Sequence, residues 1–232
     1  MKLLFAIISM LHVVACVKKQ EPASTTIPGQ PPAPIYTWLA LGDSYTIGQG
    51  VAANERFPSQ TAALLLQQGM QIQSPTYIAT TGWTSTNLQS AINTTNPNKH
   101  SIVSLLIGVN DQYQQRDTIG YRQRFTTLLE KAIELANGKK QNVIVVSIPD
   151  YSVAPFAASY DTAQIRKEID WFNNINYNVT MQHNCPYLNI TPSTREGRTN
   201  RSLIAADGLH PSGLEYKRWA EKLVPMVAQA LK

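Results

Sequence analysis

Five short apolar runs constrain the fold of this chain more than any other feature. A strand with one face in water alternates apolar and polar residues, whereas a strand buried on both faces is apolar throughout. Parallel strands are usually buried in this second way, because the helices that connect them cover both faces of the sheet. Most of the runs are continuously apolar, which favours a parallel sheet. They are Tyr36–Leu41, Thr76–Ala79, Ile102–Ile107, Val143–Ile148 and Tyr187–Ile190.

Helical patterns lie between and after these runs. Three stretches place apolar residues three or four positions apart, the spacing of a helix that buries one face. The first ends at Asn137-Gly138, a typical helix stop, and the last opens with Ser212-Gly213-Leu214-Glu215, a capping-box pattern. The three apolar stripes are Tyr121, Phe125, Leu128, Leu129, Ala132 and Leu135; Ile165, Ile169, Phe172, Ile175 and Val179; and Trp219, Leu223, Val227 and Leu231.

The alternation of strand and helix predicts an α/β fold. The simplest architecture is a three-layer α/β/α sandwich around a parallel sheet of about five strands, with right-handed crossovers. The length of 232 residues, of which 43% are hydrophobic and 15% charged, suits one domain with one sizeable core. We expect Trp171 and Trp219, which lie within or beside the helical stripes, to pack in that core.

The N-terminal region has the pattern of an export signal. Residues 1–15 contain one charge, Lys2, and an apolar stretch too short to span a bilayer comfortably. The stretch ends in Val13-Val14-Ala15-Cys16, which resembles the lipobox of bacterial lipoproteins. An ordinary signal peptidase site with a chance cysteine is the alternative. We predict an exported protein, anchored through a lipid on Cys16 to the bacterial cell envelope, at the outer membrane or the periplasmic face.

The rest of the chain then divides into a tether and a domain. Residues 16–34 are polar and proline-rich, as expected of a semi-extended spacer behind the anchor, and the domain occupies residues 35–232. Cys185 is the other cysteine, and we interpret it as an ordinary buried thiol. The 20 basic and 15 acidic residues form no basic stripe, so no nucleic-acid partner is expected, and we predict a monomer.

Four short segments carry residue types that suit one catalytic site. Three of them directly or closely follow the first three apolar runs, and the carboxyl ends of parallel strands meet at the same edge of a sheet, where ligands bind. Each segment alone is an ordinary turn or loop. Together they suggest catalysis. The segments are Gly42-Asp43-Ser44-Tyr45-Thr46, Thr81-Gly82-Trp83, Gly108-Val109-Asn110-Asp111 and Asp207-Gly208-Leu209-His210.

The roles follow from the chemistry that a serine nucleophile requires. The Ser44 hydroxyl needs a base to take its proton, and His210 is the candidate, oriented by Asp207 three residues before it. The negative oxygen that forms on the substrate needs hydrogen-bond donors. The candidates for this oxyanion hole are the backbone N–H groups of Ser44 and Gly82 and the side-chain amide of Asn110.

Other candidates are weaker. Trp83 and Asp150 each follow a predicted strand end, so we take both as tentative substrate contacts, with a structural role as the open alternative. The sequence has no His-Glu-x-x-His motif and no cysteine pair, and we expect neither a metal nor another cofactor.

At these residues the sequence resembles the SGNH hydrolases, also called the GDSL esterase/lipase family. Ser44, Gly82 and Asn110 match the residues of its first three blocks, and Asp207 and His210 match its Asp-x-x-His. The resemblance extends from about Tyr36 to the last helix and implies a flavodoxin-like sheet. Many relatives have Leu where this chain has Tyr45, which suggests a pocket of a different shape.

The resemblance implies a serine esterase that forms an acyl-enzyme. The esters could be simple acyl esters, lysophospholipids or acetylated glycans, because the family includes all of these. Two alternatives remain open: an acyltransferase acting on surface glycans, and a lipoprotein that binds glycans or lipids without turnover.

Overall fold

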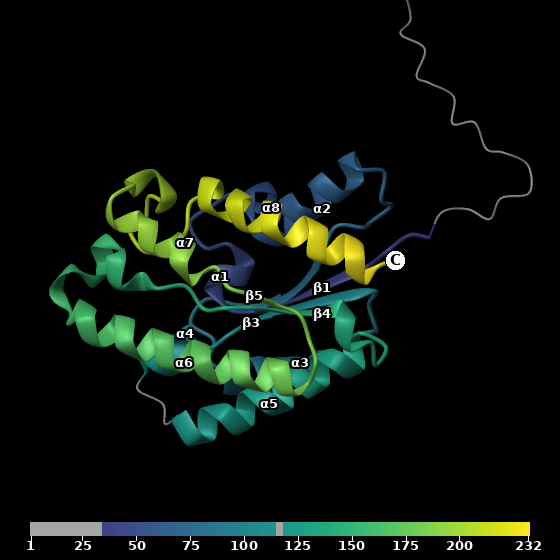
Figure 1. Cartoon of the computed structure of the whole chain (residues 1–232), viewed down its shortest axis with the longest axis horizontal. Coiled ribbons are helices and arrows are strands. Elements are labelled where there is room, and N and C mark those ends of the chain that lie inside the picture. Colours follow the sequence, from purple (N-terminus) through teal and green to yellow (C-terminus); the bar gives the residue numbers. More distant parts are fainter. Residues whose placement is uncertain (1–33, 115–117) are drawn as a thin grey trace, which may run out of the picture. The chain divides into compact units, whose positions relative to one another are not determined.

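The computed structural model describes residues 34–114 and 118–232, and residues 34–232 form one compact unit (Figure 1). Its described part contains a five-stranded sheet in which all neighbouring strands are parallel, in the order β2-β1-β3-β4-β5. This is the flavodoxin-like strand order. The strands are β1 (Trp38–Gly42), β2 (Thr76–Ala79), β3 (Ile102–Leu106), β4 (Val143–Val146) and β5 (Tyr187–Leu188).

Helices cover both faces of this sheet, which completes the predicted three-layer α/β/α sandwich. Figure 1 shows α2 and α8 on one face and α3, α5 and α6 on the other. The α-helices are α1 (Ser44–Ile47), α2 (Phe57–Gln67), α3 (Ser85–Thr95), α4 (Val109–Tyr113), α5 (Thr118–Leu135), α6 (Thr162–Gln182), α7 (Thr191–Arg195) and α8 (Gly213–Ala230). Short 3-10 helices are η1 (Ala53–Glu55), η2 (Lys140–Asn142), η3 (Tyr151–Val153), η4 (Pro155–Ser159), η5 (Glu196–Arg198) and η6 (Arg201–Leu203).

The core forms where the apolar patterns predict it. Every residue of the central strands β1, β3 and β4 is buried, as expected for strands covered on both faces. The edge strands β2 and β5 are partly exposed. All residues of the three predicted helical stripes are buried. They lie on α5, on α6 and on α8, with Leu231 as the C-terminal cap of α8. Apolar periodicity therefore located the core faces of the long helices correctly.

Two details of the helices differ from the prediction. Trp219 is fully buried, but Trp171 is 56% exposed, because its position on α6 points away from the stripe that includes Ile169 and Phe172. The capping box of α8 is only half formed. Ser212 accepts a hydrogen bond from the N–H of Glu215, whose buried carboxylate instead accepts hydrogen bonds from Ser193, Arg218 and Trp219.

The predicted signal sequence, the lipid-bearing Cys16 and nearly all of the predicted tether lie outside the described residues. Within residues 34–114 and 118–232, no helix combines the length and apolar character needed to cross a membrane. Cys185 is buried, and this burial raises the pKa of its thiol to about 11, which suits an unreactive packing residue.

The strand order determines where a ligand can bind. The chain leaves β1 toward β2 on one side, whereas β3 lies on the other side of β1. A sheet of this kind opens a crevice at this switch point, beyond the carboxyl ends of β1 and β3. Ser44 follows β1 and Asn110 follows β3, so both lie beside the crevice.

Candidate active site

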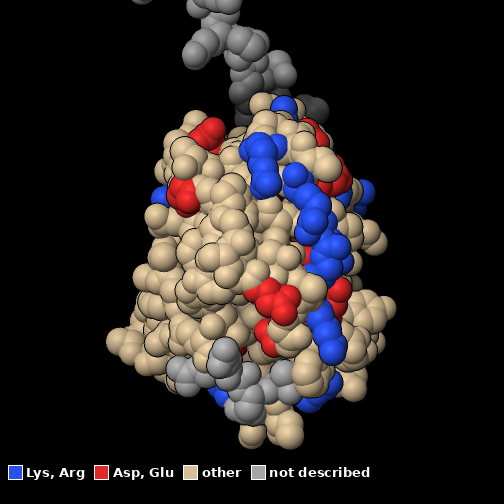
Figure 2. Space-filling model, turned by 90° about the vertical axis from the view of Figure 1, so that its left-hand side faces the viewer, with Lys and Arg blue, Asp and Glu red and all other residues tan. Residues whose placement is uncertain are grey.

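A pocket of about 150 Å³ lies at this switch point. It brings together residues from five separate segments of the chain, including four of the five residues that the sequence proposed for the catalytic site. Its lining consists of Ser44, Tyr45, Thr81, Gly82, Val109, Asn110, Tyr113, Tyr151, Phe156, Leu209 and His210. Figure 2 views the side of the domain where the carboxyl ends of the strands lie. Lys and Arg gather along one edge of this face, and uncharged residues cover most of its centre.

Ser44 is the first residue of α1, and only Asp43 separates it from the end of β1. The side chain of Asp43 caps this short helix, because its Oδ1 accepts a hydrogen bond from the N–H of Tyr45 at 3.0 Å. Asp43 is completely buried, and the loss of solvation raises its pKa to about 8, although the Tyr45 hydrogen bond opposes the shift. A side chain at Gly42 would collide with Thr46 and with the Leu106 carbonyl, so only glycine allows this close turn.

His210 and Asp207 form a compact pair. The imidazole Nδ1 lies 2.7 Å from Asp207 Oδ2, and Asp207 Oδ1 accepts hydrogen bonds from the backbone N–H groups of Leu209 and His210. Burial acts to raise the pKa of Asp207, but these hydrogen bonds outweigh it and lower the pKa below the ordinary value of 3.8. Asp207 is therefore an ionised acceptor, which keeps the proton of a neutral imidazole on Nδ1 and leaves Nε2 free.

The ring of Tyr45 packs against His210. The two ring centroids lie 5.1 Å apart with the planes tilted by 56°, and both side chains are buried. Tyr45, which stands where many relatives have Leu, is thus a direct neighbour of the His210 imidazole. It shapes the pocket wall next to His210.

Gly82 and Asn110 line the same pocket. Gly82 has a φ of 82°, a backbone conformation that favours glycine, and the space where its side chain would lie is open. The side-chain amide of Asn110 donates one hydrogen bond to the carbonyl of Trp83 at 3.0 Å. An amide nitrogen carries two hydrogens, so the second remains for a group in the pocket.

The turn from β3 into α4, the helix that carries Asn110, is held by several buried contacts. Gly108 has a φ of 128°, and a side chain there would collide with the Tyr121 hydroxyl, which donates to the carbonyl of Ile107 at 3.0 Å. The buried carboxylate of Asp111 accepts hydrogen bonds from the N–H and the hydroxyl of Ser85, at 2.7 and 2.6 Å. These contacts fix the position of Asn110 relative to α3.

The two tentative substrate contacts do not line this pocket. Trp83 packs partly buried against the core and orients Asn110 through its carbonyl. Asp150 is buried and ion-paired, with Oδ2 at 2.7 Å from the Arg195 guanidinium and 3.5 Å from that of Arg166. These interactions of Trp83 and Asp150 are of the kind expected from the structural role that the sequence left open.

The sequence also matches a family model. The model of the GDSL-like lipase/acylhydrolase family covers residues 40–218 of this chain. The chain belongs to this family. It is therefore a hydrolase of the SGNH type, and its substrates are esters. No curated protein shows significant sequence similarity to the chain.

Solved structures agree with the fold of an SGNH hydrolase. A lipase/acylhydrolase from Enterococcus faecalis is 19% identical, with a TM-score of 0.62 over 85% of this chain and 98% of that one. The esterase EstA from Pseudoalteromonas sp., in a structure inhibited by monoethylphosphonate, is 17% identical, with a TM-score of 0.60 over 84% and 98%. An acetylxylan esterase from Geobacillus stearothermophilus is 18% identical, with a TM-score of 0.60 over 83% and 94%.

The sequence reasoning missed several residues that line the pocket of this SGNH hydrolase. Tyr113 lies three residues after Asn110, and Tyr151 and Phe156 follow β4. A search for aromatic residues just beyond predicted strand ends would have found Tyr113 and Tyr151. Within the described residues, no group of three or more His, Cys, Asp or Glu side chains is placed to hold a metal ion.

Proposed function

We propose that this hydrolase cleaves esters through a catalytic triad of Ser44, His210 and Asp207, with an acyl-enzyme on Ser44. The observation that carries the proposal is the hydrogen bond between His210 and Asp207 beside a pocket that Ser44 also lines. Nucleophile, base and orienting acid come from the two ends of the described chain, and a binding protein has no need of this combination.

The reaction follows the usual course for a serine hydrolase. His210 Nε2 accepts the proton of the Ser44 hydroxyl as its oxygen attacks the ester carbonyl carbon, and the ionised Asp207 stabilises the resulting imidazolium. When the bond from the carbonyl carbon to the alcohol oxygen breaks, His210 returns the proton to the departing alcohol. Water then attacks the acyl-enzyme in the same way, which releases the acid and restores the Ser44 hydroxyl.

The oxyanion hole of this proposal consists of the N–H groups of Ser44 and Gly82 and the free hydrogen of the Asn110 amide. Such donors stabilise the charge that develops on the carbonyl oxygen, and the loss of one typically costs about 100-fold to 1,000-fold in kcat. The bond from Asn110 to the Trp83 carbonyl supports this role, because it fixes the amide before substrate arrives.

Single substitutions test the triad. We expect Ser44→Ala and His210→Ala to reduce kcat for a small activated acetate ester by about four orders of magnitude or more. Asp207→Asn should also lower kcat strongly, because an amide can favour the wrong tautomer of the imidazole. Arg195→Ala, which disturbs the Asp150 ion pair, is a control outside the pocket. Comparable activity in folded Ser44→Ala and wild-type proteins would refute the proposal.

We further propose that the protein is exported and anchored by a lipid on Cys16, and that it acts as a monomer. The lipobox pattern of the sequence supports the anchor, and the monomer stays a prediction. Labelled fatty acid should be incorporated into the wild type and not into Cys16→Ser. Equal incorporation would contradict the anchor, and a dimeric mass in sedimentation would contradict the monomer.

A further inference from the structure

Four aromatic side chains beside the pocket form one continuous surface, which we call the aromatic wall: Tyr113, Tyr151, Phe156 and Tyr160. They come from two places in the chain. Tyr113 ends α4 after β3, whereas the other three lie in and after η3 and η4, beyond β4. Ring centroids within the wall are 5.6 to 6.5 Å apart, so the rings pack against one another.

The aromatic wall extends from inside the pocket to its surroundings. Tyr113, Tyr151 and Phe156 line the pocket together with Ser44, whereas Tyr160 does not. Tyr160 continues the surface by stacking on Phe156, with ring planes only 23° apart, and its hydroxyl lies 3.5 Å from that of Tyr113. The aromatic wall is therefore continuous from the pocket lining to Tyr160 outside it.

Core packing does not account for this cluster. Only Tyr151 is buried, and its hydroxyl is satisfied by Gln112 at 3.0 Å. Tyr113 and Tyr160 are each 46% exposed, and Phe156 is 39% exposed. Contiguous exposed aromatic side chains are rare on a soluble surface unless they bind something, and here they adjoin the pocket of an esterase.

The size of the pocket determines which part of an ester it can hold. Its volume of about 150 Å³ is that of a cavity that accommodates benzene. A short acyl group such as acetyl fits within this volume, whereas a long acyl chain would extend beyond it. With the acyl group inside, the alcohol part of the ester would lie at the outer part of the pocket, where Tyr160 continues the aromatic wall.

The chemistry of the wall identifies that alcohol. The flat rings offer electron-rich faces to the C–H groups of a sugar ring, and the hydroxyls of Tyr113 and Tyr160 offer polar partners at the edge. Among the described residues that line the pocket there is no Lys, Arg, Asp or Glu, so none of these residues offers a permanent positive charge to the phosphate of a lysophospholipid. The surface suits a neutral ligand that is apolar on its faces and polar at its rim.

We propose that this hydrolase acts on short-chain esters of pyranose sugars, with the sugar ring stacked on the aromatic wall and Tyr160 as a specificity-determining residue. This inference rests on the proposed esterase function. It predicts a preference that resides in the alcohol part of the substrate.

The test compares two acetates that differ only in the alcohol: an acetylated methyl pyranoside and ethyl acetate. We expect the wild type to prefer the pyranoside in kcat/KM. Tyr160→Ala should lower kcat/KM for the pyranoside by about threefold to tenfold, the value of one aromatic contact, and leave ethyl acetate unchanged. Tyr160→Phe should retain most of the preference, because it keeps the ring face. The Tyr160→Leu variant should lose the preference for the pyranoside, because it has no aromatic ring at this position.

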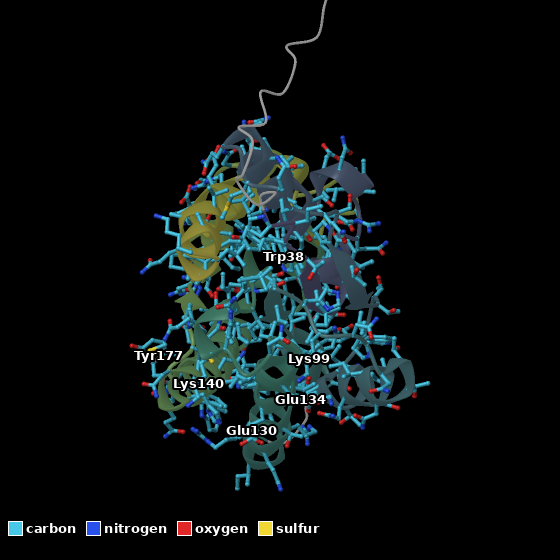
Figure 3. All side chains as sticks on the ribbon, turned by 90° about the vertical axis from the view of Figure 1, so that its right-hand side faces the viewer. Trp38, Lys99, Glu130, Glu134, Lys140 and Tyr177 are labelled. Atoms are coloured by element: carbon cyan, nitrogen blue, oxygen red, sulfur yellow. The ribbon has the colours of Figure 1, made fainter. Side chains whose placement is uncertain are left out.

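Tyr177→Ala is the matched control. Tyr177 is 47% exposed, and Figure 3 shows it on the side of the domain opposite to that of Figure 2. Tyr177→Ala should leave kcat/KM unchanged for both acetates. An equal loss on both acetates in Tyr160→Ala, an unchanged pyranoside rate, or a wild type that favours long-chain esters or lysophospholipids would overturn the inference. Failure of the triad itself would appear separately, as activity on ethyl acetate that persists in Ser44→Ala.

Discussion

Asp43 should make the stability of this protein depend on pH in an unusual direction. Its side chain is fully buried next to Ser44, and Oδ2 has no hydrogen-bond partner. Burial raises its pKa from 3.8 to about 8, and the buried charge of Asp111 adds to the shift. The folded protein therefore keeps a proton on Asp43 in a range where the unfolded chain has lost it.

The size of the effect follows from this difference in protonation. Each pH unit between the unfolded and the folded pKa lowers the free energy of unfolding by about 1.4 kcal/mol. Asp43 therefore stabilises the fold most in acid, and this contribution is lost as pH rises toward the folded pKa of about 8. From about pH 5 to about pH 7 the loss amounts to about 3 kcal/mol.

Asp43→Asn isolates this contribution, because the amide does not titrate and its oxygen can still accept the hydrogen bond from Tyr45. Urea unfolding of both proteins at several pH values gives the free energies. The stability of the variant relative to the wild type should increase by about 3 kcal/mol between about pH 5 and about pH 7. Parallel stability curves would refute the raised pKa, since every other titrating group is common to both proteins.

Three further substitutions test the framework around the site. Gly50→Ala places a methyl group 2.8 Å from Asp207 Oδ2 at a φ of 84°, and should lower kcat by about tenfold to 100-fold; an unchanged kcat would show that Asp207 tolerates displacement. Gly108→Ala brings a methyl group against the Tyr121 hydroxyl at a positive φ, and should cost about 2 kcal/mol or more in urea unfolding; wild-type stability would contradict this. Glu215→Gln weakens the buried hydrogen bonds that Glu215 accepts from Ser193 of α7 and from Trp219 of α8, so thermal unfolding should give a loss of about 1–3 kcal/mol, and no loss would contradict that role.

Apolar patterns were sufficient to predict the layers of the fold. A continuous apolar run is a local property, and it identified β1, β3 and β4 because these strands are buried on both faces. Helical stripes identified the core faces of α5, α6 and α8 for the same reason. The prediction for Trp171 failed because a large aromatic residue next to a stripe was taken as part of it, although helix geometry turns it toward solvent.

The site was predictable where a few local segments carry the chemistry. Asp207 and His210 lie three residues apart, so one turn brings them into contact. The assembly of the aromatic wall was not predictable, although Tyr113 and Tyr151 follow predicted strand ends. Tyr113 meets Phe156 and Tyr160 only after β3 and β4 are paired and the loops after them are folded. The buried ion pairs of Asp150 likewise depend on Arg195, which is distant in sequence.

Covalent labelling tests the central claim most directly. A fluorophosphonate reacts with an activated serine, and peptide mass analysis then identifies the modified residue. The account predicts a single adduct on Ser44, strongly reduced labelling in His210→Ala, and none in Ser44→Ala. A folded wild-type protein that remains unlabelled, or one labelled on a serine other than Ser44, would contradict it.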